Sequence, residues 1–241
     1  MHRCPEPAIY SQGHMETRAK VTSVTDHPFD WDIYWRNGAK GDVDQMSMGA
    51  RNMAVRLTKF IEGKGIRSLA DFGCGTGETL LILANEHPNM EFHGFDSSTV
   101  AVELDRSRAD ELKTLNIRFE REDVRDISTR DRFDLVMCIA TLHYIKDIRK
   151  ALRDLFARVD RGGSLIFNYP NRSSMYGFRD WIETEAPELR NRYRLVLRGE
   201  NLLTLDDIRE TLGKRPLNFW RAVGEEPSRQ NMCVYVTKGQ Q

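Results

Sequence analysis

The sequence contains few cysteines and no close cysteine pair. Its four cysteines, Cys4, Cys74, Cys138 and Cys233, lie far apart, so neither a CxxC metal site nor a disulfide framework is indicated. This usage is typical of a reducing compartment, and we expect a cytoplasmic protein without a bound metal. No apolar run approaches the roughly 20 residues of a membrane span, and the N-terminus lacks the apolar core of a signal peptide. We therefore expect no membrane partner.

The chain also lacks an excess of charge of either sign. Lysine plus arginine and aspartate plus glutamate number 36 each among 241 residues, so the net charge is zero. Because nucleic-acid-binding domains are commonly basic, nucleic acid is not an expected partner. No proline- and glycine-rich linker divides the middle of the chain. We expect residues 1–26, which are polar and aperiodic, to form a disordered extension, and residues 27–241 to form one domain.

Short apolar runs alternate with amphipathic stretches from Ser68 onward. Apolar runs predict five strands, at 68–72, 91–95, 117–121, 133–138 and 164–168. Amphipathic periodicity predicts helices at 46–61, 78–86, 98–113, 148–159 and 205–212. Arg161-Gly162-Gly163 is expected to end the helix at 148–159, and Val102 and Leu112 are expected to face inward. Two final β segments, 217–222 and 232–237, can pair antiparallel. This alternation favours an α/β fold with a doubly wound, mostly parallel sheet and helices on both faces.

Glycines cluster in the turn after the first predicted strand, Asp71-Phe72-Gly73-Cys74-Gly75-Thr76-Gly77. Alternate glycines let the backbone bend sharply and approach a ligand closely. A dinucleotide fingerprint requires glycine three residues after its second glycine, where this chain has Glu78. A nicotinamide oxidoreductase is therefore disfavoured. Asp71 beside the turn would repel a pyrophosphate but attract an ammonium group.

Two more aspartates follow the next two predicted strands. Asp96 follows the second strand and Asp123 the third. Ligands of open α/β sheets bind at the carboxyl ends of the strands, so Asp71 and Asp96 should face one crevice. Asp96 can accept hydrogen bonds from two ribose hydroxyls, and Asp123 from an adenine amine. The alternatives are a solvated loop residue at Asp96 and a helix cap or turn former at Asp123.

Together with Phe133-Asp134-Leu135-Val136 and Arg161-Gly162-Gly163, these motifs resemble those of the Rossmann-like (class I) S-adenosylmethionine-dependent methyltransferases over residues 65–170. The resemblance implies S-adenosylmethionine as the cofactor and a seven-stranded sheet with an antiparallel last strand. It implies that the glycine turn contacts the methionine part, Asp96 the ribose, and Asp123 with Val124 the adenine. The residues expected to bind the cofactor are Tyr34, Trp35, Asp71, Gly73, Cys74, Gly75, Thr76, Gly77, Asp96, Ser97, Asp123, Val124, Cys138 and Ala140.

The segment after the fourth predicted strand, 138–144, lines the methyl-donor pocket in that family. Its His143 is the candidate general base, because the ordinary pKa of histidine lies near neutrality. The alternative is that His143 only shapes the pocket. Tyr34 and Trp35, within a helical segment at 27–64, resemble the aromatic lid of small-molecule members, and their faces could attract the sulfonium. Packing against the core is the alternative for both.

Residues 170–203 occupy the place where this family inserts acceptor-binding elements. Arginines there, including those at 179, 190, 192, 194 and 198, could clamp a carboxylate or phosphate, although interleaved glutamates also fit a solvated helix face. The residues expected to bind the acceptor are Tyr144, Tyr169, Arg172, Tyr176 and Arg179. The predicted function is methyl transfer to an oxygen, nitrogen or carbon of a small molecule, in secondary metabolism, by a monomer or homodimer. An RNA or protein methyltransferase and a non-catalytic S-adenosylmethionine-binding protein are the alternatives.

Overall fold

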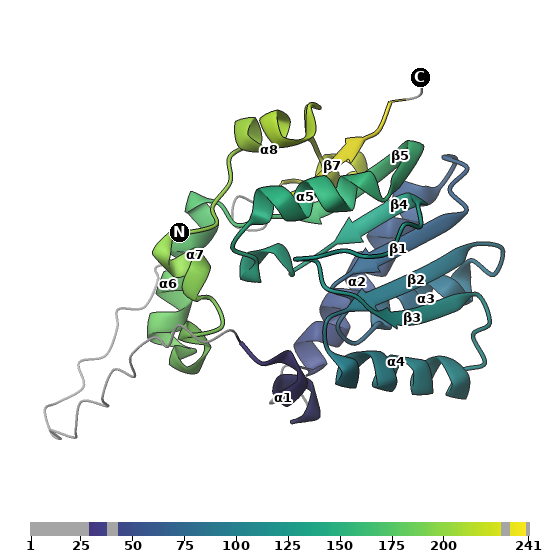
Figure 1. Cartoon of the computed structure of the whole chain (residues 1–241), viewed down its shortest axis with the longest axis horizontal. Coiled ribbons are helices and arrows are strands. Elements are labelled where there is room, and N and C mark those ends of the chain that lie inside the picture. Colours follow the sequence, from purple (N-terminus) through teal and green to yellow (C-terminus); the bar gives the residue numbers. More distant parts are fainter. Residues whose placement is uncertain (1–28, 38–42, 228–231, 240–241) are drawn as a thin grey trace, which may run out of the picture.

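Seven strands form one sheet at the centre of the described chain (Figure 1). The computed structural model describes residues 29–37, 43–227 and 232–239, and the predicted extension at 1–26 lies outside them. The strand order is β3-β2-β1-β4-β5-β7-β6. The strands are β1 (Ser68–Phe72), β2 (Glu91–Asp96), β3 (Ile117–Arg121), β4 (Phe133–Cys138), β5 (Val159–Asn168), β6 (Leu217–Asn218) and β7 (Cys233–Thr237).

The pairing of the strands confirms the predicted fold class. β1 pairs in parallel with β2 and β4, and the β2–β3 and β4–β5 pairs are also parallel. β7 runs antiparallel to both of its neighbours, β5 and β6. The sheet is thus mostly parallel, with an antiparallel last strand.

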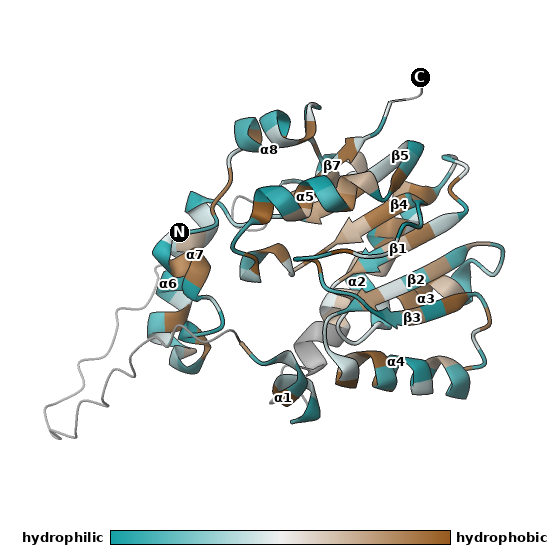
Figure 2. Cartoon of the chain, in the orientation of Figure 1, coloured by the Kyte–Doolittle hydropathy of each residue, from teal (hydrophilic) through white to brown (hydrophobic). Residues whose placement is uncertain are grey.

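Helices cover both faces of the sheet (Figure 1). Hydrophobic residues dominate the central strands, whereas the outer sides of α4, α5 and α8 are largely hydrophilic (Figure 2). The helices are α1 (Trp31–Arg36), α2 (Val43–Ile61), α3 (Glu78–Glu86), α4 (Thr99–Glu111), α5 (Ile148–Ala157), α6 (Arg172–Thr184), α7 (Arg194–Arg198), α8 (Leu205–Leu212) and α9 (Phe219–Ala222), with the 3₁₀ turns η2 (Leu142–Tyr144) and η3 (Pro187–Arg190).

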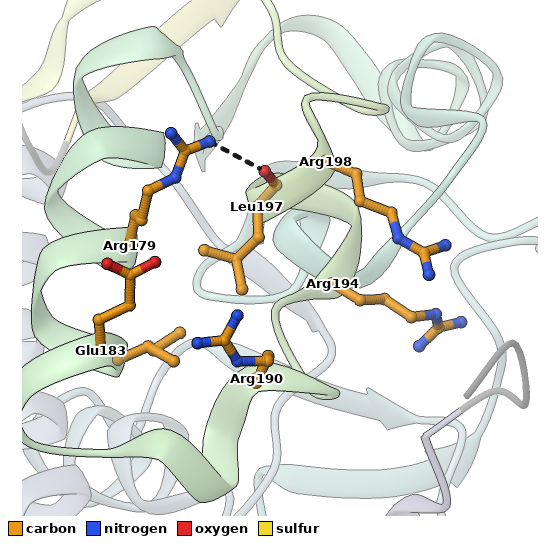
Figure 3. Close-up of a pocket in the computed structure, with 7 residues that line it drawn as sticks. Arg179, Glu183, Arg190, Arg194, Leu197 and Arg198 are labelled. Carbon is orange, nitrogen blue, oxygen red and sulfur yellow. Dashed lines mark hydrogen bonds between the residues drawn. The ribbon is translucent and has the colours of Figure 1, made fainter. Parts of the chain in front are cut away.

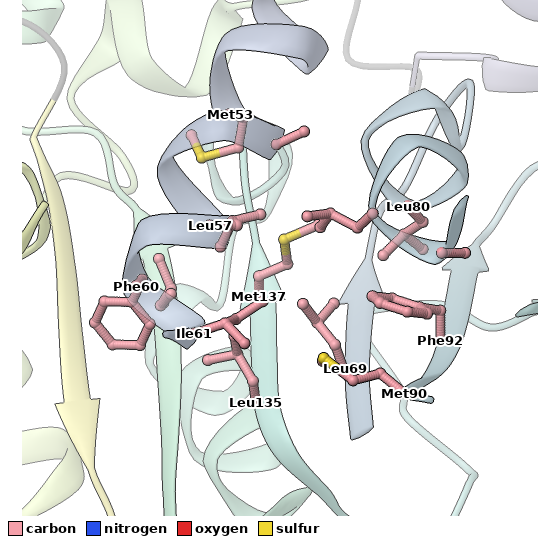
Figure 4. Close-up of a cluster of buried hydrophobic side chains, with 14 of the residues drawn as sticks. Met53, Leu57, Phe60, Ile61, Leu69, Leu80, Met90, Phe92, Leu135 and Met137 are labelled. Atoms are coloured by element: carbon pink, nitrogen blue, oxygen red, sulfur yellow. The ribbon is translucent and has the colours of Figure 1, made fainter. Parts of the chain in front are cut away.

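Two hydrophobic clusters, one on each face of the sheet, hold these layers together. On one face Leu57 and Phe60 of α2 and Leu80 of α3 pack with Met137 of β4 (Figure 4). On the other face α5 and α8 pack against β4 and β5. Successive strand residues point to opposite faces, so Met137 belongs to the first cluster and the following residue, Cys138, to the second.

Three sequence predictions about local structure are wrong. Arg161-Gly162-Gly163 does not end a helix but lies inside β5, because Gly162 N–H donates to the Lys238 carbonyl and Lys238 N–H to the Gly163 carbonyl, both at 2.9 Å. Leu112 caps the C-terminus of α4 and is 65% exposed. Residues 219–222 form α9 rather than a strand, since the Asn218 side chain accepts from the Arg221 N–H at 3.0 Å. Long-range strand pairing and helix capping therefore determine the local structure at these three positions.

Candidate functional site

A cavity of about 780 Å³ lies at the carboxyl ends of the parallel strands. Its volume is within the roughly 300–1,000 Å³ usual for small-molecule sites. Residues that follow β1, β2, β3 and β4 line it, together with α1, α2 and the segment before α7. The predicted cofactor residues that line it are Tyr34, Trp35, Asp71, Gly73, Cys74, Gly75, Thr76, Asp96, Ser97, Asp123, Val124 and Ala140.

The glycine turn is held against the end of β2. The N–H groups of Gly73 and Cys74 both donate to the Phe95 carbonyl, at 2.7 and 3.0 Å. Gly73, Gly75 and Gly77 all have positive φ, which disfavours any residue with a Cβ. A Cβ on Gly75 would lie 3.1 Å from the Trp35 ring, so α1 covers this turn.

Asp71 and Asp96 are buried carboxyl groups at the edge of the cavity. Burial, with the nearby Asp96, raises the pKa of Asp71 well above its ordinary value. Among the described residues, Asp71 Oδ1 has no hydrogen-bond partner. Each oxygen of Asp96 accepts one backbone N–H, from Gly75 at 3.0 Å and from Ser98 at 2.9 Å. Because a carboxylate has about four acceptor positions, Asp96 can still bind two hydroxyls.

These features fit the cofactor that the sequence predicts. The orphan oxygen of Asp71 suits an ammonium group, and the remaining lone pairs of Asp96 suit a ribose diol. The glycine turn leaves a cradle that side chains would fill. Asp123, which the resemblance assigns with Val124 to the adenine, forms an ion pair with Arg125, whose Nε lies 2.9 Å from both carboxylate oxygens. Partial burial raises the pKa of Asp123, but the hydrogen bonds from Arg125 outweigh it and the pKa lies below its usual range.

Asp105 of α4 lies directly beneath the turn, and no sequence pattern singles it out. Its side chain is fully buried, and a Cβ on Gly77 would lie 2.8 Å from its carboxyl carbon. Burial raises the pKa of Asp105 to about 8. At neutral pH the folded protein therefore keeps this group protonated, whereas the unfolded chain ionises it.

Replacing Asp105 with asparagine is expected to stabilise the protein in a pH-dependent way. A carboxyl pKa that folding raises costs stability as pH increases from about 4 to about 8, by at most roughly 1.4 kcal/mol per pH unit. The gain of Asp105→Asn in free energy of unfolding should thus be small at pH 4.5 and larger at pH 8, measured by urea denaturation. Asp110→Asn, on the exposed side of the same helix, is the matched control. An equal gain at both pH values would contradict this account.

α1 closes the cavity from the N-terminal side. Asp32 accepts from Ser98 Oγ at 2.6 Å and so joins α1 to the start of α4. Tyr34 and Trp35 are both buried and line the cavity. On its other side α1 contacts Arg192, whose Nη1 donates to the Tyr34 hydroxyl at 3.3 Å. The arrangement agrees with the predicted lid, and the same contacts also pack α1 against the core.

Part of the cavity wall combines aromatic rings with arginines. Tyr144 is the predicted acceptor residue that lies there. Arg192 and Tyr193, from the turn before α7, lie beside it, with Arg192 Nε donating to the Tyr144 hydroxyl at 3.2 Å. Ala140, elsewhere in the lining, has a φ of 58°, a strained conformation for a residue with a Cβ, and its N–H donates to Asn168 Oδ1 at 2.7 Å. Strained backbone often marks a functional site.

His143 does not line this cavity. The histidine is 7% exposed, and its ring packs edge-on against Phe178 with the centroids 5.5 Å apart. Burial lowers its pKa to about 4. The described geometry places His143 outside the cavity lining, which favours the alternative that it shapes the pocket, and its role as the base stays a prediction. Cys138 and Gly77 also lie outside the cavity lining. Cys138 belongs to the hydrophobic cluster that α5 and α8 form with the sheet, and Gly77 packs against Phe119.

The other predicted acceptor residues lie elsewhere. Tyr169 points into the core at the end of β5, and Arg172 and Tyr176 are exposed on α6. Arg179 lines a separate pocket of about 180 Å³ between α6 and α7, where its guanidinium donates to the Leu197 carbonyl at 3.3 Å (Figure 3). The placements of Arg172, Tyr176 and Arg179 follow from the rotation of α6, which the sequence pattern did not define.

Sequence reasoning missed several residues of the cavity as site residues. Among them are Trp31, Thr141, Ile139, Asn168, Arg194 and Tyr193. The arginines within residues 170–203 pointed to Arg192 and Arg194, but the sequence gave no means of choosing among these arginines. Thr141 could have been suspected because it lies within the 138–144 segment at the end of β4.

Within the described part of the chain, no helix is both long and apolar enough to cross a bilayer. No group of three or more potential metal ligands occurs there either. The three described cysteines, Cys74, Cys138 and Cys233, are not in disulfides.

Comparison with known proteins places the chain in a family. A methyltransferase domain profile matches residues 64–205. Malonyl-[acyl-carrier protein] O-methyltransferase 1 of Ilyobacter polytropus is 28% identical over 160 residues, which are 66% of this chain and 59% of that protein. Trans-aconitate 2-methyltransferase of Deinococcus radiodurans is 34% identical over 122 residues, which are 50% of this chain and 45% of that protein. The chain thus spans about half of the length of these relatives.

The fold comparison agrees. The plantazolicin methyltransferase BpumL, solved in complex with SAH, superposes with a TM-score of 0.65 at 14% identity, over 86% of this chain and 91% of that one. At this identity the likeness establishes a shared fold. Because the profile covers more than half of the chain and the sheet has the matching topology, the chain belongs to the class I S-adenosylmethionine-dependent methyltransferases.

Proposed function

We propose that the chain transfers a methyl group from S-adenosylmethionine to a small-molecule acceptor held against Tyr144, Arg192 and Tyr193. One observation carries the proposal: a single cavity joins the glycine turn and its carboxylates to an aromatic and cationic wall. A protein that only binds the cofactor would not need the second half of this cavity. The names of the relatives agree, since trans-aconitate 2-methyltransferase is named for a small acid.

The residues of this chain would act mainly by binding and positioning. Asp71 would hold the ammonium group, Asp96 the ribose, and Asp123 with Val124 the adenine. When bound, S-adenosylmethionine supplies a methyl carbon on a positively charged sulfur, which is open to direct displacement. Trp35 and Tyr34 of α1 would exclude water from the cavity. Orientation of the two reactants can provide roughly 7–11 kcal/mol of the reduction in the activation barrier.

A macromolecular acceptor is the main alternative. The relative named for malonyl-[acyl-carrier protein] shows that this family includes an enzyme whose acceptor group is carried on a protein. The cavity of about 780 Å³, with α1 along one side, favours an acceptor small enough to enter. The cytoplasmic location, the single domain over 27–241, the role in secondary metabolism and the monomeric or dimeric state stay predictions.

The test uses binding and transfer together. Calorimetry with S-adenosylhomocysteine is expected to show binding at micromolar levels. Incubation with methyl-labelled S-adenosylmethionine and separate small-metabolite, RNA and protein fractions should place the label in the small-metabolite fraction. Label found only in RNA or protein would refute the small-molecule acceptor. Binding without transfer to any fraction would indicate a non-catalytic protein, and failure to bind would refute the cofactor site.

A further inference from the structure

The charged side chains that line the cavity separate by sign. The acids among the described lining residues lie in the last residues of strands β1, β2 or β3 or in the segments after them: Asp71, Glu78, Asp96, Glu122 and Asp123. Lys146 follows β4, and Arg192 and Arg194 follow β5. In the strand order these positions fall on opposite halves of the sheet edge. The cofactor half of the cavity is therefore acidic and the acceptor half basic.

Two further arginines line the cavity, Arg125 and Arg56. Arg125 pairs with Asp123, and Arg56 Nε lies 2.8 Å from a carboxylate oxygen of Glu225. The cations that line the acceptor half are Lys146, Arg192 and Arg194.

Arg192 is the most firmly placed of these three cations. Four rings surround its guanidinium carbon, with centroids at 4.9 Å (Tyr34), 5.5 Å (Tyr193), 5.6 Å (Trp31) and 5.7 Å (Tyr144). The hydroxyls of Tyr34 and Tyr144 accept from it. Because the rings restrict its rotamers, binding to it costs little side-chain entropy. A planar, fixed guanidinium matches the geometry of a carboxylate.

The chemistry of a carboxylate also suits this cavity. None of the described residues that line the cavity is a histidine. An alcohol or ammonium acceptor must lose a proton to react, which a general base usually accepts. A carboxylate is already ionised at neutral pH, since carboxyl groups have an ordinary pKa of about 4. It requires no base.

We propose, resting on the function proposed above, that the acceptor is an organic acid, that its carboxylate is the methylated group, and that Arg192 binds that carboxylate. Arg192 donates to one carboxylate oxygen, and the other oxygen uses a lone pair to form the new C–O bond to the methyl carbon. The S–C bond breaks, and its electron pair stays on sulfur. The carboxylate becomes a neutral methyl ester and the sulfonium a neutral thioether, so no proton is transferred. Lys146 and Arg194 attract the anion to this half of the cavity.

The first experiment identifies the chemistry of the product. The full chain is incubated with methyl-tritiated S-adenosylmethionine and either a small-metabolite fraction or a set of acids: benzoate, succinate, malonate, citrate and trans-aconitate, with their methyl esters as neutral controls. Methyl esters release labelled methanol in mild alkali, whereas methyl ethers, methylamines and C-methyl products do not. We expect alkali-labile label. Alkali-stable label would overturn the carboxylate acceptor while leaving methyl transfer intact.

The second experiment tests Arg192 with the acceptor so identified. Arg192→Met is expected to raise the KM for the acceptor at least about 30-fold, the loss typical of removing one partner of a charge pair. The Kd for S-adenosylhomocysteine should change less than about threefold, because the cofactor groups lie on the other half. Arg192→Lys should recover part of the loss. Arg190→Met, in the adjacent η3 outside this cavity, is the matched control and should resemble the native chain.

Each remaining outcome has a distinct meaning. If Arg192→Met and Arg190→Met behave alike, Arg192 does not bind the acceptor. If Arg192→Met weakens S-adenosylhomocysteine and the acceptor equally, Arg192 serves only to hold α1 closed. No transfer to any small molecule, despite cofactor binding, would refute the proposed function itself.

Discussion

Replacing Asp71 with asparagine is expected to weaken the binding of S-adenosylhomocysteine about 100-fold and, at the same time, to stabilise the cofactor-free protein. The affinity falls because the ammonium group of the ligand loses a buried carboxylate, a change that typically costs about 2–5 kcal/mol. The stability rises because Asp71 is buried with an oxygen that no described residue satisfies.

The sign of the stability change follows from the pKa. Burial raises the pKa of Asp71 well above 3.8, so the unfolded chain ionises this group more readily than the folded protein does. The folded state therefore loses stability as pH rises above the ordinary carboxyl range, and asparagine removes that loss. Few other substitutions would move affinity and stability in opposite directions.

Calorimetry with S-adenosylhomocysteine and thermal unfolding without ligand check both effects. Asp134→Asn is the matched control, because Asp134 accepts from the N–H groups of Arg67 and Ser68 at the opposite end of β1, at 2.8 and 3.1 Å. It should lower stability and leave affinity unchanged. A cofactor-free Asp71→Asn protein that unfolds at a lower temperature than the native chain would show that Asp71 serves the fold rather than the ligand.

Gly73→Ala is expected to have the second large effect, which is loss of cofactor binding together with strong destabilisation. The new Cβ would lie 2.1 Å from Thr141 Oγ1 and 2.8 Å from Thr141 Cβ, so no rotamer of Thr141 relieves the clash. The φ of Gly73, +84°, adds backbone strain. Overpacking and strain together should cost roughly 2–5 kcal/mol. The turn must move, and the cradle for the methionine part moves with it.

Gly63→Ala separates the two contributions. Gly63 has a φ of +70°, but a Cβ there would meet nothing within 4 Å. This control should therefore show the strain alone, with a loss of about 1–2 kcal/mol and normal cofactor affinity. Urea denaturation and calorimetry give both quantities. Equal losses of stability in the two variants, with affinity retained in both, would mean that contact with Thr141 does not restrict the turn.

Much of the cofactor half of the cavity could be predicted from the sequence. Strand periodicity placed Asp71, Asp96 and Asp123 at or just after the ends of successive strands, and parallel strands bring their carboxyl ends together. The structure indeed puts all three in the lining of one cavity. Glycines at alternate positions after β1 indicated the tight turn, because only glycine adopts such φ values without strain. The glycine turn and the strand-end carboxylates depend on residues close together in the chain, so the sequence pattern is sufficient to predict them.

The acceptor half could not be predicted in the same way. Arg172, Tyr176 and Arg179 were as plausible as Arg192 in the sequence, but the rotation of α6 turns them away from the cavity. His143 was the candidate base in the sequence, whereas in the structure its ring is buried against Phe178 and lies outside the cavity lining. Asp105, far from the turn in sequence, reaches it only because α4 packs beside β3.

By itself the sequence determined the order of strands and helices over residues 68–168, the glycine turn and the carboxylates at the ends of three strands, because each depends on residues close together in the chain. Only the tertiary structure decided which arginine enters the cavity, which histidine is buried and which carboxyl keeps its proton. Those properties depend on contacts among segments distant in the chain, as when Trp31, Tyr144 and Arg192 meet across more than 150 residues.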